Sequence, residues 1–150
     1  MERLLWQVLP MNRYAEWNAD FDGHPAAHCC LYTGAGDLAR LGDWILQEHK
    51  AGTGPAAEWI RASVTDTVDP NWTCQFQGST LQFRYGYQWW VPSDDRDGFT
   101  AIGTQGQYLH LFPKQNVVVV QIGEQLATDA AAWHATRLLR LEQINSQKTR

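Results

Sequence analysis

The stretch from residue 99 to residue 120 constrains the fold more than any other part of this chain. Two strand-like runs, 99–102 and 107–112, meet across Gly103 and Gly106, and a turn at 113–116 leads into four consecutive valines. Strand-like runs separated by glycine- and proline-containing turns predict antiparallel hairpins. Because the valines do not alternate with polar residues, we expect both faces of that strand to be covered.

Helices are predicted before and after these strands. The first helix is expected to have Thr33 as its N-cap, Asp37 in its first turn and Gly52 as its stop. Pro55 is a good first residue for a second helix. Asp129 can cap a third helix, whose apolar stripe fades after residue 144.

The order of these elements predicts an α+β fold. Two helices precede antiparallel strands at 83–91, 99–102, 107–112 and 117–122, and we expect the C-terminal helix to cover the sheet. The polar connection at 63–82 is long for a compact domain, and connections of that length are often functional. The 150 residues are enough for about one domain with its own core.

Composition excludes several classes of partner. The net charge is −4 and the basic residues are scattered, whereas nucleic-acid binding needs a basic face. We therefore expect no nucleic-acid partner. No run approaches the ~18 apolar residues of a membrane span, and the first residues lack the apolar core of a signal peptide.

The cysteines and nearby histidines first suggest a metal site. His24, His28, Cys29 and Cys30 lie close together, but zinc sites space paired ligands by two or more residues and draw them from two places. Only Cys74 lies elsewhere, so we expect no metal and interpret the pair as small packed residues. An odd cysteine count favours a reducing compartment such as the cytoplasm without fixing it.

Four segments, in order along the chain, resemble the serine β-lactamase-like family. Residues 9–17 resemble its "PLGM…W" segment, 31–42 its "GLxSTxxDLARFG" helix start, 85–90 its "YGYGWWV" strand and 103–113 its "GxxGQ…P" strand pair. The family includes class C β-lactamases, D-alanyl-D-alanine carboxypeptidases, related esterases and nylon-oligomer hydrolases. The resemblance implies the second half of that fold, and it places Cys30 where the family has a glycine.

Two of the three catalytic motifs of this family are missing. Its enzymes use Ser-x-x-Lys, then Tyr-x-Asn or Tyr-x-Ser, then Lys-Thr-Gly or a variant. No serine here is followed by lysine at the third position, and none of the 5 tyrosines by Asn or Ser at the second. Residues 101–103 represent the third motif without its lysine, which resembles the esterase and amide-hydrolase branches. We therefore expect residues 1–150 to be the C-terminal part of a hydrolase domain, inactive in isolation.

The resemblance also implies a site along the glycine-containing crossing. In the family, one oxyanion donor is the backbone N–H just after the third motif, which here belongs to Thr104. Gly103, Gln105 and Gly106 are then implied to line the substrate site, since glycine permits close approach to the backbone. From the residues alone, the simpler interpretation of this stretch is a plain hairpin with glycine bulges.

Three aromatic residues are further candidates for a functional site. Trp89 and Trp90 should point to opposite faces of one strand, one into the core and the other as a wall of a substrate cleft. His110 lies within a strand and is interpreted as a sheet residue in preference to a catalytic base.

Two functions remain open. In the first, the chain is part of a serine hydrolase that cleaves an ester or amide of a small molecule without a cofactor. Its expected partner is then a missing N-terminal half or a second copy of the chain. Alternatively, it is a non-catalytic small-molecule-binding or interaction module derived from that fold.

Overall fold

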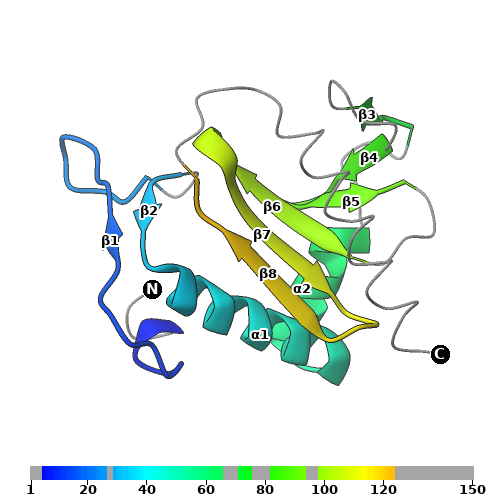
Figure 1. Cartoon of the computed structure of the whole chain (residues 1–150), viewed down its shortest axis with the longest axis horizontal. Coiled ribbons are helices and arrows are strands. Elements are labelled where there is room, and N and C mark those ends of the chain that lie inside the picture. The colour runs from blue at the N-terminus through cyan, green and yellow to red at the C-terminus, as the bar shows by residue number, and fades with distance from the viewer. Residues whose placement is uncertain (1–4, 27–28, 66–70, 76–81, 94–97, 124–150) are drawn as a thin grey trace.

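The computed structural model describes residues 5–26, 29–65, 71–75, 82–93 and 98–123. The short strands β1 (Glu16–Trp17) and β2 (Leu31–Tyr32) form a separate two-stranded sheet. Helices α1 (Ala35–Ala51) and α2 (Pro55–Thr65) follow. Six antiparallel strands then form one sheet in the order β3-β4-β5-β6-β7-β8, so each strand pairs with its neighbour in sequence (Figure 1). These strands are β3 (Cys74–Gln75), β4 (Gln82–Tyr85), β5 (Trp90–Pro92), β6 (Phe99–Gly103), β7 (Gln107–Phe112) and β8 (Val117–Gln121).

The predicted hairpins at 99–121 are confirmed. Strand β6 pairs with β7 in a register that sets Phe99 opposite Leu111 and Gly103 opposite Gln107. Strand β7 pairs with β8 from Tyr108 opposite Gln121 to Phe112 opposite Val117. The antiparallel α+β architecture expected from the sequence is therefore present in the described residues.

The N-cap of helix α1 lies one residue later than predicted. Gly34, not Thr33, is the N-cap, and no side chain caps this end. Asp37 lies in the first turn as expected, and Gly52 ends the helix in the left-handed conformation at φ 71°, with its N–H donating to the Glu48 carbonyl. A glycine adopts this conformation without the steric cost that a Cβ brings.

The main core lies between the helices and one face of the sheet. Ile45 and Leu46 of α1 and Ile60 and Val64 of α2 pack against apolar residues of β6 and β7, which are Phe99, Leu109 and Leu111. Gly42 permits this close packing, since a Cβ there would lie 2.7 Å from Cγ1 of Val118. The opposite face carries a second cluster of Phe83 and Phe112, with Trp90, Val117 and Val119 against it.

The valine strand is covered less completely than predicted. Val118 and Val120 contact the first cluster, and Val117 and Val119 contact the second, so both faces have apolar neighbours. Each of the four side chains nevertheless remains only half-buried, because β8 lies at the end of the strand order.

The prediction of one strand over residues 83–91 is wrong. The chain turns back between β4 and β5, and the Gly86 N–H donates to the Trp89 carbonyl at 2.9 Å. Gly86 packs so tightly on α2 that a Cβ there would lie 2.0 Å from the Ser63 carbonyl oxygen. Gln88 takes a positive φ of 70° to close the turn.

Two other predictions fall wholly or partly outside the described residues. The helix expected from Asp129 lies outside them altogether. Within the predicted 63–82 connection, α2 extends to Thr65 and β3 pairs with β4, so the connection is shorter than expected. No helix in the described ranges has the length and apolar character needed to cross a bilayer.

Candidate functional site

The predicted site residues next to the third motif lie together in one exposed turn. Thr104–Gly106 form a single 3-10 turn between β6 and β7. Gly103, Thr104 and Gln105 are exposed and Gly106 is half-buried. Gln105 at φ 61° and Gly106 at φ 81° both adopt left-handed conformations. The turn therefore lies at the surface, with Thr104 and Gln105 open to solvent.

The end of β8 holds this turn in place. The Gln107 side-chain amide donates to the Gly123 carbonyl at 2.5 Å. Gly123 also lies close to the turn, since a Cβ on it would be 3.3 Å from the carbonyl oxygens of Gln105 and Gly106. A fixed backbone is what a preorganised hydrogen-bond donor requires. This geometry is compatible with the oxyanion role that the resemblance implies for Thr104.

The two tryptophans lie apart from this turn. Trp89 makes an edge-to-face contact with Phe99 at 4.9 Å between ring centroids and packs on the helix-covered core. Trp90 lies on the opposite face, 4.7 Å from Tyr85 and 6.2 Å from the half-exposed Trp72. Since Trp90 pairs with Thr100, Gly103 is three residues farther along β6, or about 10 Å away at ~3.4 Å per residue. The structure thus places the tryptophans on opposite faces, but not beside Thr104.

His110 is a sheet residue, as predicted. Its side chain is 2% exposed, and its Nδ1 lies 2.9 Å from the Thr100 hydroxyl on the neighbouring strand. Its ring stacks between those of Tyr108 and Phe112. A ring enclosed in this way cannot reach a substrate at the surface.

Asp37 is an anchoring residue whose role the sequence did not reveal. Its carboxylate accepts hydrogen bonds from the backbone N–H groups of Asn12 at 2.8 Å and Arg13 at 3.0 Å, and from Arg40 at 3.1 Å. The Asn12 N–H contributes most to lowering the pKa of Asp37, and Arg13 and Arg40 add to it, while burial acts in the opposite direction. The side chain is only 2% exposed. Asp37 therefore fixes the N-terminal segment against the start of α1.

A groove of about 550 Å³ lies beside these Asp37 contacts. It lies between the N-terminal segment and α1, and the residues that line it are Leu9, Pro10, Gly36, Ala39, Arg40, Asp43, Trp44 and Gln47. None of the predicted site residues lines it, so the groove and the exposed turn are separate features.

The cysteine pair differs from expectation. Cys29 and Cys30 are both exposed and are joined by a disulfide, whereas packed small residues were predicted. They lie directly before β2. Cys30 has φ 69°, the backbone conformation that glycine favours, and the resemblance places it at a family glycine.

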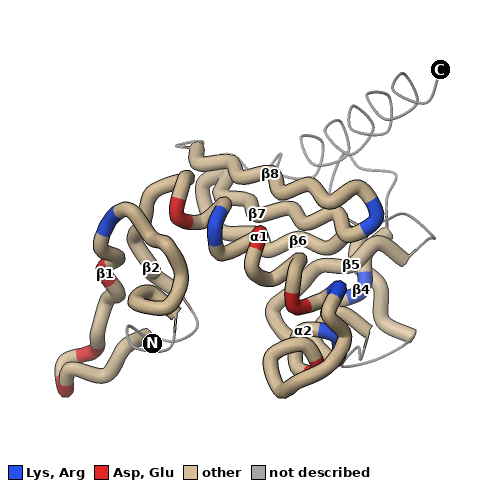
Figure 2. Tube along the Cα trace, turned by 90° about the horizontal axis from the view of Figure 1, so that it is seen from below, with Lys and Arg blue, Asp and Glu red and all other residues tan. Residues whose placement is uncertain are grey.

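One group of metal-ligating side chains occurs in the described part of the chain. Asp20, Asp22 and His24 have ligand atoms within 4.8 Å of one another, and all three are exposed. Asp20 already accepts the backbone N–H groups of Asp22 and His24, which accounts for the cluster as a local turn. Figure 2 shows the charged residues spread over separate elements, with no single basic face in the described ranges.

No family model matches the chain. It is 29% identical over 138 residues to the 6-aminohexanoate-dimer hydrolase of Paenarthrobacter ureafaciens, covering 87% of this chain and 34% of that protein. The chain is distantly related to a serine-hydrolase-like protein. It spans about a third of the length of this relative. At this coarse level the similarity agrees with the hydrolase family that the sequence segments resemble.

Proposed function

We propose that this chain supplies one wall of an ester- or amide-cleaving site in a β-lactamase-related serine hydrolase. In this proposal, the Thr104 backbone N–H is one of two oxyanion donors. Gly103, Gln105 and Gly106 form the rim beside it. The nucleophile and its proton-transfer groups come from residues outside these 150.

The fixed and exposed turn at Thr104 is the observation that carries the proposal. When a nucleophile attacks a carbonyl, negative charge develops on the carbonyl oxygen, and a rigid N–H at that point stabilises the transition state. Thr104 is exposed, and the Gln107–Gly123 hydrogen bond restrains the neighbouring backbone. The oxygen needs only a backbone donor, so the identity of the side chain at 104 is secondary.

The two tryptophans have a smaller role in the proposed site than the sequence predicted. Trp90, together with Tyr85 and Trp72, forms an aromatic patch on the sheet face opposite the helices. An aromatic wall at this distance would contact the far end of a substrate and not its reacting carbonyl. Trp89 belongs to the core side of the sheet.

Activity of the chain alone and in a hybrid tests the proposal. The hybrid is the 6-aminohexanoate-dimer hydrolase with its aligned segment replaced by this chain. We expect the isolated chain to remain unlabelled by a fluorophosphonate probe and to leave a chromogenic ester intact. We expect the hybrid to hydrolyse ester or amide substrates. Ester turnover by the isolated chain that survives stringent purification would contradict the assignment of roles.

The alternative, a non-catalytic binding module, predicts a different pair of results. The isolated chain would unfold cooperatively as a monomer, and a folded hybrid would be inactive. Buried residues of the described core, such as Leu46 and Leu111 at 0% exposure, give the chain some capacity to fold alone. An inactive but well-folded hybrid would therefore favour the module over the hydrolase part.

A further inference from the structure

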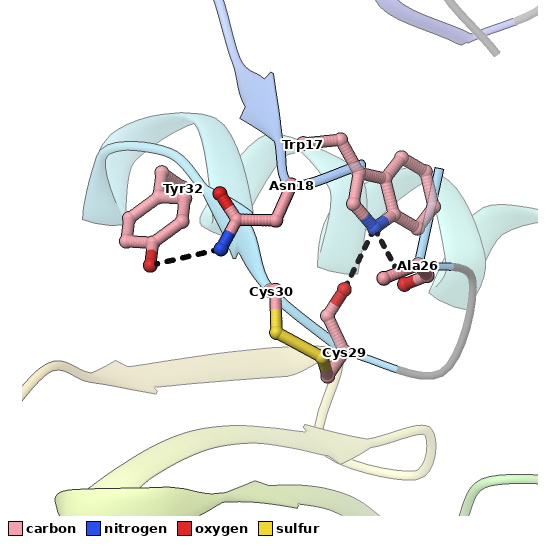
Figure 3. Close-up of a disulfide and its surroundings, with 6 residues drawn as sticks. All are labelled: Trp17, Asn18, Ala26, Cys29, Cys30 and Tyr32. Carbon is pink, nitrogen blue, oxygen red and sulfur yellow. Dashed lines mark hydrogen bonds between the residues drawn. A yellow bond between two sulfur atoms is a disulfide. The ribbon is translucent and has the colours of Figure 1, made fainter. Parts of the chain in front are cut away.

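The most unusual chemical group in the described residues is the disulfide between two adjacent cysteines. Cys29 and Cys30 are bonded to each other (Figure 3). Both residues are exposed. Cys74, the remaining cysteine, is free and half-buried. An exposed disulfide is open to attack by a thiolate, which is the route by which such bonds are reduced.

The cysteine pair is also connected to the β1–β2 sheet. The indole N–H of Trp17 donates to the carbonyl of Cys29 at 2.7 Å and to that of Ala26 at 2.9 Å (Figure 3). The backbone N–H of Asn18 donates to the carbonyl of Cys30 at 3.1 Å. Trp17 is a β1 residue that pairs with Leu31 of β2. Any change in the backbone of the cysteine pair is therefore transmitted directly to this sheet.

The bond also restricts the backbone of the pair. A disulfide between neighbouring residues closes a small ring that includes the peptide bond between them. Cys30 has φ 69°, a conformation that residues with a Cβ rarely adopt. We expect opening of the ring to remove the restraint, so that Cys30 relaxes toward the extended conformation of the strand that follows it. The carbonyls that accept from Trp17 and Asn18 would turn with it.

We propose that Cys29–Cys30 is a reversible redox site whose reductant is a dithiol, either a small molecule or a dithiol protein. One thiolate of the reductant attacks a sulfur of the pair and forms a mixed disulfide. The second thiolate then attacks that bond, so the pair takes up two electrons and two protons and becomes two thiols. The reductant leaves as its own disulfide. A small-molecule disulfide such as oxidised glutathione reverses the reaction.

Reduction should loosen the β1–β2 sheet, because both cysteine carbonyls are acceptors for residues 17 and 18. The site is independent of the proposed hydrolase role, since neither cysteine belongs to the exposed turn at Thr104. The redox state of the pair and the mobility of the sheet can both be measured on the whole chain.

Counting thiols tests whether the bond exists and is reversible. The full chain, purified without reductant, is unfolded and alkylated, and its intact mass is measured. We expect one alkyl group, on Cys74. After treatment of the folded chain with dithiothreitol we expect all 3 cysteines to be alkylated, and after oxidised glutathione only one again. Three alkyl groups without prior reduction would overturn the proposal.

Amide hydrogen exchange tests whether the bond controls the sheet. On reduction we expect the Asn18 amide to exchange ~10-fold faster or more, because its acceptor carbonyl is released. A Cys29→Ser, Cys30→Ser double variant should show the fast rate with or without dithiothreitol. A Cys74→Ser variant should respond as the wild type does. Equal Asn18 exchange in the oxidised and reduced wild type would overturn the proposed switch.

Discussion

At the scale of single residues, Asp37 shows how a charge in the first turn of a helix can fix a distant segment. Its carboxylate accepts two backbone N–H groups from residues 12 and 13, and one hydrogen bond from Arg40. Its pKa is lowered from the usual 3.8, mainly by the Asn12 N–H. A lowered pKa means that the folded state favours the charged form more than the unfolded state does.

This shift gives Asp37 a pH-dependent effect on stability. Its contribution is fully present above the unfolded-state pKa near 3.8, and it is lost as the pH falls through the lower folded-state value. We therefore expect Asp37→Asn to lower the urea midpoint clearly at pH 7, with a smaller difference from wild type at about pH 3. Asp43→Asn, an exposed position on the same helix, is the control and should have little effect at either pH. A difference for Asp37→Asn that stays constant with pH would contradict this account.

The sequence predicted the structural roles of some residues and not of others. Gly52 ends α1 as expected, because glycine adopts the left-handed conformation that commonly ends a helix. The Thr33 cap was displaced by one residue, which lies within the usual uncertainty of helix ends. The Asp37 contacts depend on segments 24 and 25 residues apart that are brought together in space, and no local pattern specifies them. The disulfide joins neighbouring residues, and the pattern of two adjacent cysteines does not specify their oxidation state.

At the scale of elements, α1 lies close against the sheet because it has a glycine at the point of contact. A Cβ at Gly42 would lie 2.7 Å from Cγ1 of Val118 and 3.1 Å from the methyl groups of Leu109 and Leu111. Gly36, in the same helix, is exposed, and its nearest neighbour is the flexible end of Arg40 at 3.4 Å. The two glycines therefore differ in environment but share a helical backbone.

Substituting alanine at each glycine should have opposite effects. Alanine stabilises a helix by about 0.5–1 kcal/mol relative to glycine, so Gly36→Ala should raise the free energy of unfolding by about that amount. At Gly42 overpacking costs ~1–3 kcal/mol, which exceeds this gain, so Gly42→Ala should lower it. Urea unfolding of both variants measures the difference. Stabilisation by Gly42→Ala would show that the helix does not lie as close to β7 and β8 as described.

The elements themselves were predictable where turns and strands alternate clearly. The hairpins between residues 99 and 121 and the start of α2 at Pro55 match the sequence expectation. The single strand over 83–91 failed because nothing in the local sequence shows that Gly86 packs against the Ser63 carbonyl of α2. That contact accompanies the turn between β4 and β5. Trp89 therefore lies in the connection, and Trp90 begins β5.

At the scale of the whole molecule, the valine strand β8 is the feature that most affects association. Among the described residues, no strand pairs with its outer edge, and the strand has neither a charged residue nor a proline. Native sheet edges usually carry such residues, which prevent pairing with other chains. In the proposed hydrolase, residues outside these 150 would cover this edge, and in the isolated chain a second copy can do so.

We expect the isolated chain to self-associate as its concentration rises. Sedimentation velocity over a range of concentrations measures this directly, and the weight-average sedimentation coefficient should increase. The increase follows from backbone groups on an apolar edge strand that can pair with another chain. A chain that stays monomeric at all concentrations and melts cooperatively would instead favour the self-contained binding module.

The most direct test of the central claim compares two substitutions at Thr104 in the hybrid hydrolase. Thr104→Ala keeps the backbone N–H, whereas Thr104→Pro removes it. The preceding Gly103 is extended at φ −106° and ψ 167°, which suits a following proline. Urea unfolding of both hybrids checks that they fold alike. If the Thr104 N–H is an oxyanion donor, kcat/KM for Thr104→Pro should be ~10²–10³-fold lower than for Thr104→Ala. Equal kcat/KM values for the two folded variants would contradict that claim.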